Sequence, residues 1–141
     1  MKRFLLTAAA LLLALPGLRA QAFDDDFENA TLRLDYVFCG DNAHQAIYFQ
    51  QALRTSAWAG RRNNLSAPLL EGNGQIRVLD PETGRCLYAN SFSTLFQEWQ
   101  VEEEATRLRK AFDNCFQVPF PKRPWTSKSF SWTRTGTGLP T

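Results

Sequence analysis

The only histidine, His44, is the first side chain to consider for catalysis. A catalytic zinc site usually takes two or three histidines, and the motif H-E-x-x-H is absent. His44 follows Asp41 and Asn42 in a turn-like segment, with no nucleophile motif beside it. The acidic residues, which could supply paired carboxylates for glycoside cleavage, fall mainly in an expected exposed terminus and at the start of a predicted helix. We therefore expect no catalytic residue and no metal ligand set; without a glycine-rich phosphate loop, we also expect no cofactor.

Three cysteines, Cys39, Cys86 and Cys115, could do redox or metal chemistry. Their spacing matches no zinc ligand pattern, and three are too few for a disulfide scaffold. The sequence favours small apolar core residues. The alternative is a single disulfide between two of them, which an oxidising compartment would permit.

A tryptophan and two arginines, Trp58, Arg61 and Arg62, form the third candidate, in the loop WAGRRNNL of residues 58–65. As a binding surface they would suit a glycan or an anion, through ring stacking and forked hydrogen bonds. As structural residues, Trp58 would fill the edge of the core while an arginine holds loop carbonyls. We favour the structural interpretation, because tryptophan dominates packing energetics where it is buried.

The first 22 residues have the features of a signal peptide. Lys2 and Arg3 precede an apolar run over residues 4–15, which is short for a membrane span, and residues 20–22 (AQA) fit the cleavage rule. The mature chain would begin at Phe23 and be secreted or periplasmic, with no membrane association after cleavage. Loss of Lys2, Arg3 and Arg19 takes the formal net charge from +2 to −1, which argues against a nucleic-acid partner.

Four acidic residues then follow between positions 24 and 28. They lack the alternating spacing and the glycine of a calcium-binding loop, so we expect a solvated terminus.

The elements that must hold these side chains are mostly strands. Residues 74–92 predict a β-hairpin, because apolar residues alternate on both sides of a turn at 80–84 (DPETG). Residues 31–39 alternate in the same way, and residues 46–53 fit a strand about as well as a short helix; we predict a strand. Residues 116–120 are also expected to be extended.

One amphipathic helix is predicted after the hairpin. Five residues fall at helical spacing: Val101, Ala105, Leu108, Phe112 and Cys115. Acidic residues at 102–104 and basic residues at 107–110 would suit the helix dipole. The predicted fold is mainly β, an antiparallel β-sandwich-like domain with this helix packed on it.

Residues 125–141 differ from the rest in being rich in Ser, Thr and Gly without a clear period. They would form a linker-like tail. A second hypothesis is a lost nucleotide just before Trp125, because restoring it regroups the codons into an alternating, strand-like segment. Resequencing the locus distinguishes the two.

Four segments in order resemble one protein family. They are residues 32–36 (LRLDY) followed by Gly40, residues 58–65 (WAGRRNNL), residues 91–99 (SFSTLFQEW) and residues 119–122 (PFPK). Together they resemble the N-terminal domain of the IgA peptidases, the secreted zinc metallopeptidases numbered sixty-four among metallopeptidase families. The resemblance covers residues 23–124, and it implies a β-sandwich-like accessory domain ahead of a catalytic zinc domain.

That catalytic domain is missing from the sequence, so no catalytic residue can be carried over and the chain is expected to be truncated. The resemblance implies a non-catalytic domain for scaffolding or substrate presentation, with a downstream zinc peptidase domain or its protein substrate as partner. The alternative function is a secreted surface module that binds glycan or protein through Trp58, Arg61 and Arg62.

Overall fold

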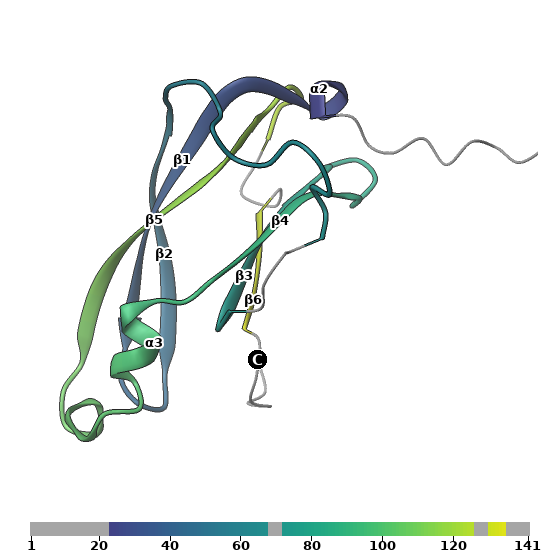
Figure 1. Ribbon diagram of the computed structural model, residues 1–141. Coiled ribbons are helices and arrows are strands. Elements are labelled where there is room, and N and C mark those ends of the chain that lie inside the picture. The colour runs from purple at the N-terminus through teal and green to yellow at the C-terminus, as the bar shows by residue number, and fades with distance from the viewer. Residues whose placement is uncertain (1–22, 68–71, 126–129, 135–141) are drawn as a thin grey trace, which may run out of the picture.

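The computed structural model describes residues 23–67, 72–125 and 130–134, and the backbone alone in the last of these ranges (Figure 1). The predicted signal peptide, residues 1–22, lies outside the described residues. No helix within the described ranges has the length and apolarity needed to cross a membrane.

The first sheet has the order β2-β1-β5 and is antiparallel throughout. Its central strand is β1 (Phe27–Gly40), flanked by β2 (Gln45–Arg54) and β5 (Lys110–Pro121). Alternate residues of β1 are buried, from Leu32 to Phe38, as the sequence predicted for residues 31–39. The strand predicted over 46–53 is confirmed by β2, and the extended chain at 116–120 by β5.

The second sheet has the order β4-β3-β6, where β6 is Phe130–Arg134, and is again antiparallel. The predicted hairpin is confirmed by β3 (Gly74–Leu79) and β4 (Cys86–Phe92). In its turn, Asp80 Oδ1 accepts from the backbone N–H groups of Glu82 and Thr83, both at 3.0 Å. Gly84 has a φ of 70°, a conformation that favours glycine.

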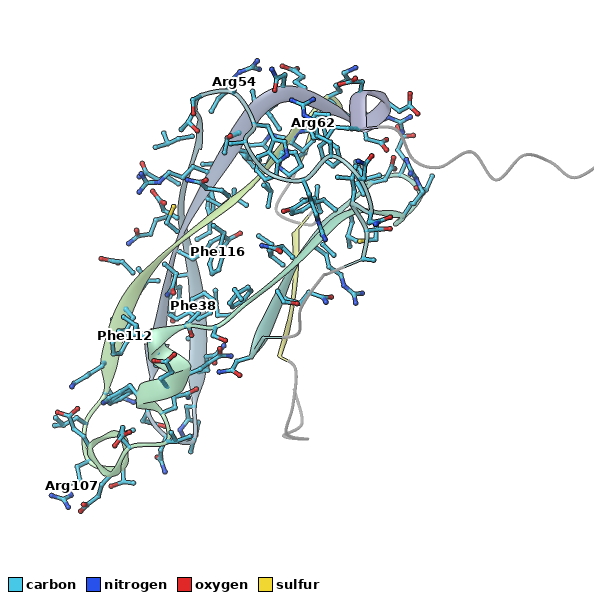
Figure 2. The ribbon with its side chains drawn as sticks, in the orientation of Figure 1. Phe38, Arg54, Arg62, Arg107, Phe112 and Phe116 are labelled. Atoms are coloured by element: carbon cyan, nitrogen blue, oxygen red, sulfur yellow. The ribbon has the colours of Figure 1, made fainter. Side chains whose placement is uncertain are left out.

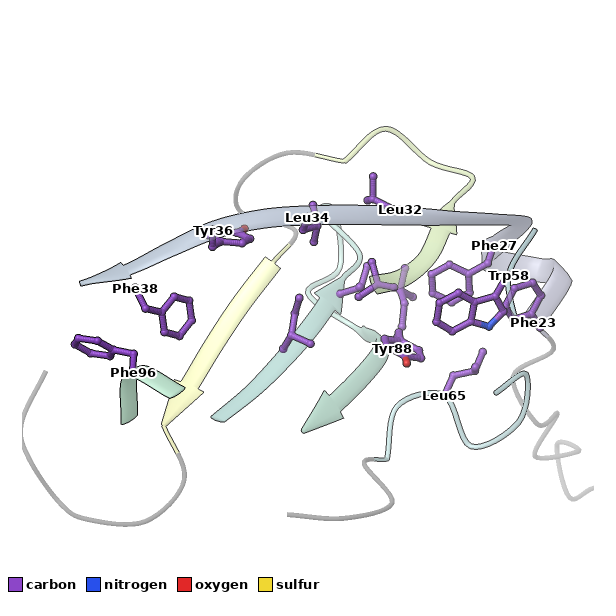
Figure 3. Packing of buried hydrophobic residues seen from close by; sticks show 14 of the residues in the cluster. Phe23, Phe27, Leu32, Leu34, Tyr36, Phe38, Trp58, Leu65, Tyr88 and Phe96 are labelled. Atoms are coloured by element: carbon purple, nitrogen blue, oxygen red, sulfur yellow. The ribbon is translucent and has the colours of Figure 1, made fainter. Parts of the chain in front are cut away.

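The hydrophobic core lies between the two sheets, with β1 contributing most of one wall (Figure 3). At one end Phe23, Phe27 and Trp58 gather near Tyr88 of β4. At the other end Phe38 faces Phe96. The mainly β, antiparallel, sandwich-like fold predicted from the sequence is therefore confirmed.

The helix predicted from Val101 to Cys115 is wrong. That stretch holds a 3-10 turn, η1 (Glu103–Thr106), and the first half of β5, while the packed helix is the shorter α3 (Leu95–Trp99). Val101 and Leu108, assigned to the buried face, are 84% and 50% exposed. The strand is favoured because alternate residues of β5 pack on the core beside β1.

The acidic segment at 24–28 is only partly a solvated terminus. Asp24 and Asp25 are exposed in the short helix α2 (Phe23–Asp26), but the side chain of Asp26 is buried and pairs with Arg85 at 2.9 Å. Glu28 pairs with Arg54 across the sheet at 2.7 Å. These pairs connect the start of β1 and the residue before it to β2 and to the turn between β3 and β4.

The final strand, β6 (Phe130–Arg134), pairs with β3. It falls in the tail that the sequence suggested to be linker-like or frameshifted. No strand was predicted there in the reading frame as it stands.

Candidate functional site

Trp58, the predicted stacking residue, lies at the edge of the core. It is 9% exposed, meets Tyr88 edge-on with ring centroids 5.8 Å apart, and donates from Nε1 to the carbonyl of Arg61 at 3.0 Å. A Cβ on Gly60 would lie 2.2 Å from Trp58 Cζ2, so only glycine fits against this ring. The ring is thus held on several sides by its own loop.

Arg61 points its guanidinium into the same loop. It donates to the carbonyls of Ala67 at 2.6 Å and Leu65 at 3.1 Å, and also to the carbonyl of Ala89 in β4. Its Cζ atom lies 5.1 Å from the centroid of the Tyr88 ring. Burial raises the pKa of the Tyr88 phenol, with Arg61 opposing the shift. Arg61 therefore holds loop carbonyls, as the structural interpretation proposed.

Arg62 is the exposed member of the predicted surface, at the end of the molecule that also carries Arg54 (Figure 2). It donates to the Asn29 side chain and lies over the Phe23 ring, 4.4 Å from its centroid. The structure thus brings the three residues into one loop but gives each of them intramolecular partners. That they bind a ligand stays a prediction.

A cavity of about 410 Å³ lies beside Trp58. Its wall combines the Trp58 and Tyr88 rings with uncharged hydroxyl and amide side chains from β1, β4, β5 and the end of β2: Thr31, Thr55, Ser56, Asn90 and Gln117. These polar residues were not predicted from the sequence, because they are far apart in the chain. The signal for Thr31, Asn90 and Gln117 was their position on predicted strands, and Thr55 and Ser56 lie just beyond the strand predicted over residues 46–53.

His44 stands at the opposite end of the β2-β1-β5 sheet, in the turn between β1 and β2. Its Nδ1 lies 2.9 Å from Asp41 Oδ1, which also accepts from the backbone N–H groups of Ala43 and His44. Arg109 donates to the second Asp41 oxygen at 3.0 Å. These hydrogen bonds, that of His44 first, hold the pKa of Asp41 well below its usual range. Asp41 therefore fixes the turn between β1 and β2, and His44 is one of its hydrogen-bond partners.

The three cysteines are all free in the structure. Cys39 and Cys115 lie on neighbouring strands, but Cys115 is opposite Asp35, four residues from Cys39. At about 3.3 Å per residue this offset is roughly 13 Å, too far for a disulfide. Cys86 belongs to the other sheet.

The sequence suggested that the cysteines are buried core residues, and this prediction is wrong. Cys115 is exposed and the other two are half-buried. Desolvation and a hydrogen bond with Asp35 raise the pKa of the Cys115 thiol, and burial raises the pKa of the Cys86 thiol. Raised pKa values disfavour the reactive thiolate.

No group of three or more His, Cys, Asp or Glu side chains that could hold a metal ion occurs among the described residues. Ion pairs within the fold engage Asp26, Asp35, Asp41 and Asp80. These carboxylates therefore fix turns and strands of the domain.

Comparison with known proteins gives one family. The search of curated proteins finds no match. The family model described as Peptidase M64 N-terminus matches residues 22–128, which include both sheets up to the start of β6. The match covers well over half of the sequence, and it agrees with the four segments in which the resemblance was seen. The chain therefore belongs to the Peptidase M64 N-terminus family.

Proposed function

We propose that this chain is an exported, non-catalytic accessory domain of the IgA-peptidase type, which supports a zinc peptidase domain or presents protein substrate to it. The family match over residues 22–128 carries the proposal. It is supported by the use of the domain's carboxylates and arginines in structural pairs, such as Asp26 with Arg85 and Asp80 with Arg123.

A surface suited to such a support role lies in the connection from α3 to β5, at one end of the first sheet (Figure 1). Leu95, Val101 and Leu108 are exposed there, with Arg107 at the same end (Figure 2). Apolar side chains exposed close together on a surface are a feature of contacts between domains. We assign this connection as the contact with the peptidase domain.

The test adds the purified chain to an M64-family peptidase domain made without its own N-terminal domain. We expect the chain to raise the melting temperature of the peptidase domain, and Val101→Asp with Leu108→Asp to abolish the increase. Tyr48→Asp with Leu53→Asp, a matched pair on the other edge of the sheet, should leave it intact. No increase with the parent chain would contradict the support role.

A second function, a module for neutral glycans, is favoured by the cavity beside Trp58. Two aromatic rings with hydroxyl and amide groups, and no charge in its wall, suit a sugar. Because Trp58 is buried, its replacement would disturb the fold. Asn90→Ala and Gln117→Ala change exposed side chains instead, so loss of glycan-array binding in both would support this function. Absence of binding by the parent would exclude it for the glycans tested.

A further inference from the structure

Edge strands of a sheet expose unpaired backbone groups, and two edges of this molecule are blocked. Along β4, the Ala89 N–H donates to the Leu65 carbonyl at 2.8 Å and Arg61 donates to the Ala89 carbonyl. Loop 58–67 therefore covers this edge. Along β5, Pro119 and Pro121 have no N–H to offer, and the Asn114 side chain donates to the Phe112 carbonyl at 3.0 Å.

The edge at β2 has neither kind of protection. The strand, QAIYFQQALR, has ten residues with no proline, no lysine and no acid. Its single charge, Arg54, is at its end and is engaged by Glu28 at 2.7 Å and by the Phe120 ring. Within the described residues β2 pairs with β1 alone. A bulge opposite Asp35 and Tyr36 bends it but leaves most of the strand regular.

Large apolar side chains are exposed on both faces of this one strand. Phe49 is opposite Tyr36 on the core face, with ring centroids 5.4 Å apart, and is 52% exposed. Tyr48 and Leu53 are opposite Val37 and Arg33 on the outer face, and are 61% and 42% exposed. A partner lying on one face would cover only one of these groups. A strand added at the edge would cover part of both and pair the free backbone groups.

We propose that two copies of this chain associate by antiparallel pairing of β2 with β2, which forms a continuous six-stranded sheet. Antiparallel pairing places the two Arg54 side chains, the only charges of the strand, at opposite ends of the new ladder, so no like charges meet across it. A two-fold axis brings the same exposed apolar residues together, as an isologous interface requires. This surface is distinct from the α3–β5 connection assigned to the peptidase domain.

The test measures the mass of the exported chain in solution by sedimentation equilibrium. We expect twice the chain mass at high concentration and the single mass on dilution. Tyr48→Lys with Leu53→Lys should give the single mass throughout, because like charges would meet across the two-fold axis. Val101→Lys with Leu108→Lys adds the same charge elsewhere and should leave the dimer intact.

A mixing experiment distinguishes charge repulsion at the interface from misfolding as the cause of a monomeric variant. The lysine pair and the matching pair Tyr48→Glu with Leu53→Glu should each be monomeric alone and form a mixed dimer together. Backbone amides of residues 45–54 should exchange hydrogen more slowly in the dimer than in the monomer. A monomeric parent, a dimer that survives the lysine pair, or two variants that do not associate on mixing would each overturn the proposal.

Discussion

At the scale of single residues, Arg61 links the loop after β2 to the edge of the second sheet. Its guanidinium donates to the carbonyls of Leu65, Ala67 and Ala89. Leu65 also accepts from the Ala89 N–H and Ala67 is exposed, so the buried Ala89 carbonyl depends most on Arg61. Charge-assisted hydrogen bonds contribute more than neutral ones, and buried carbonyls left without a donor are costly.

Replacement of Arg61 by alanine should lower the free energy of unfolding by about 2–4 kcal/mol, from lost charge-assisted hydrogen bonds and from the buried Ala89 carbonyl left without its donor. Urea denaturation of the purified chain measures this. The neighbouring change Arg62→Ala removes an exposed side chain and should cost less than about 1 kcal/mol. Equal effects of the two changes would contradict the structural role of Arg61.

Asp80 gives the stability of the domain a dependence on pH. Two backbone N–H groups in the hairpin turn, with Arg123 at 2.9 Å, hold the pKa of Asp80 below its ordinary value of 3.8. A carboxyl whose pKa is lower in the folded state stabilises it above the unfolded pKa, and this stability is lost as pH falls through the folded pKa.

Asp80→Asn should therefore reduce the urea midpoint at neutral pH and flatten its decline toward acid. The asparagine keeps an acceptor oxygen but loses the charge. Glu82→Gln, an exposed position in the same turn, is the control and should follow the parent. An unchanged pH profile in Asp80→Asn would show that this aspartate does not contribute.

At the scale of elements, the sequence predicted the hairpin well and the helix badly. In residues 74–92 apolar residues alternate on both sides of a turn whose Asp, Pro and Gly residues favour a chain reversal. This combination indicates a β-hairpin. In β5, Phe112, Phe116 and Phe120 are four residues apart, a spacing that places them on one side of either a helix or a strand. Pairing with β1, which the sequence of β5 does not reveal, selects the strand.

The short helix α3 is anchored by one side chain. Phe96 is fully buried and packs between Trp99 and Phe112, with ring centroids about 6 Å apart. Thr94 caps the helix by accepting from the Gln97 N–H at 3.2 Å.

Phe96→Ala should cost about 3–5 kcal/mol of unfolding free energy, as expected for a buried aromatic ring. Leu95→Ala, on the exposed side of the same helix, should change it by less than about 0.5 kcal/mol. Thermal and urea unfolding of the two variants measure the difference. A small effect of Phe96→Ala would mean that α3 is not packed as described.

At the scale of the whole molecule, the sheets join residues that the sequence separates widely. Trp58 and Arg61 could be identified from the composition of their loop, and so could the tendency of tryptophan to be buried. Asn90 and Gln117 could not be assigned to the same cavity, because the pairings of β3 with β4 and of β1 with β5 decide their positions.

Shortening the chain before or after β6 measures how much this last strand stabilises the domain. A chain that ends at Pro124 lacks β6 and leaves the second edge of β3 unpaired. We expect a lower urea midpoint and more light scattering on heating than for the parent. A chain that ends at Arg134 keeps the strand and should match the parent. Identical behaviour of all three chains would show that β6 adds no stability.

We propose that this domain of the M64 family supports a peptidase domain and does not hydrolyse protein itself. The most direct measurement is hydrolysis of casein and of immunoglobulin by the purified chain, with added zinc and with a chelator. We expect no cleavage above the buffer blank in either condition. Cleavage that the chelator abolishes and zinc restores would contradict the proposal.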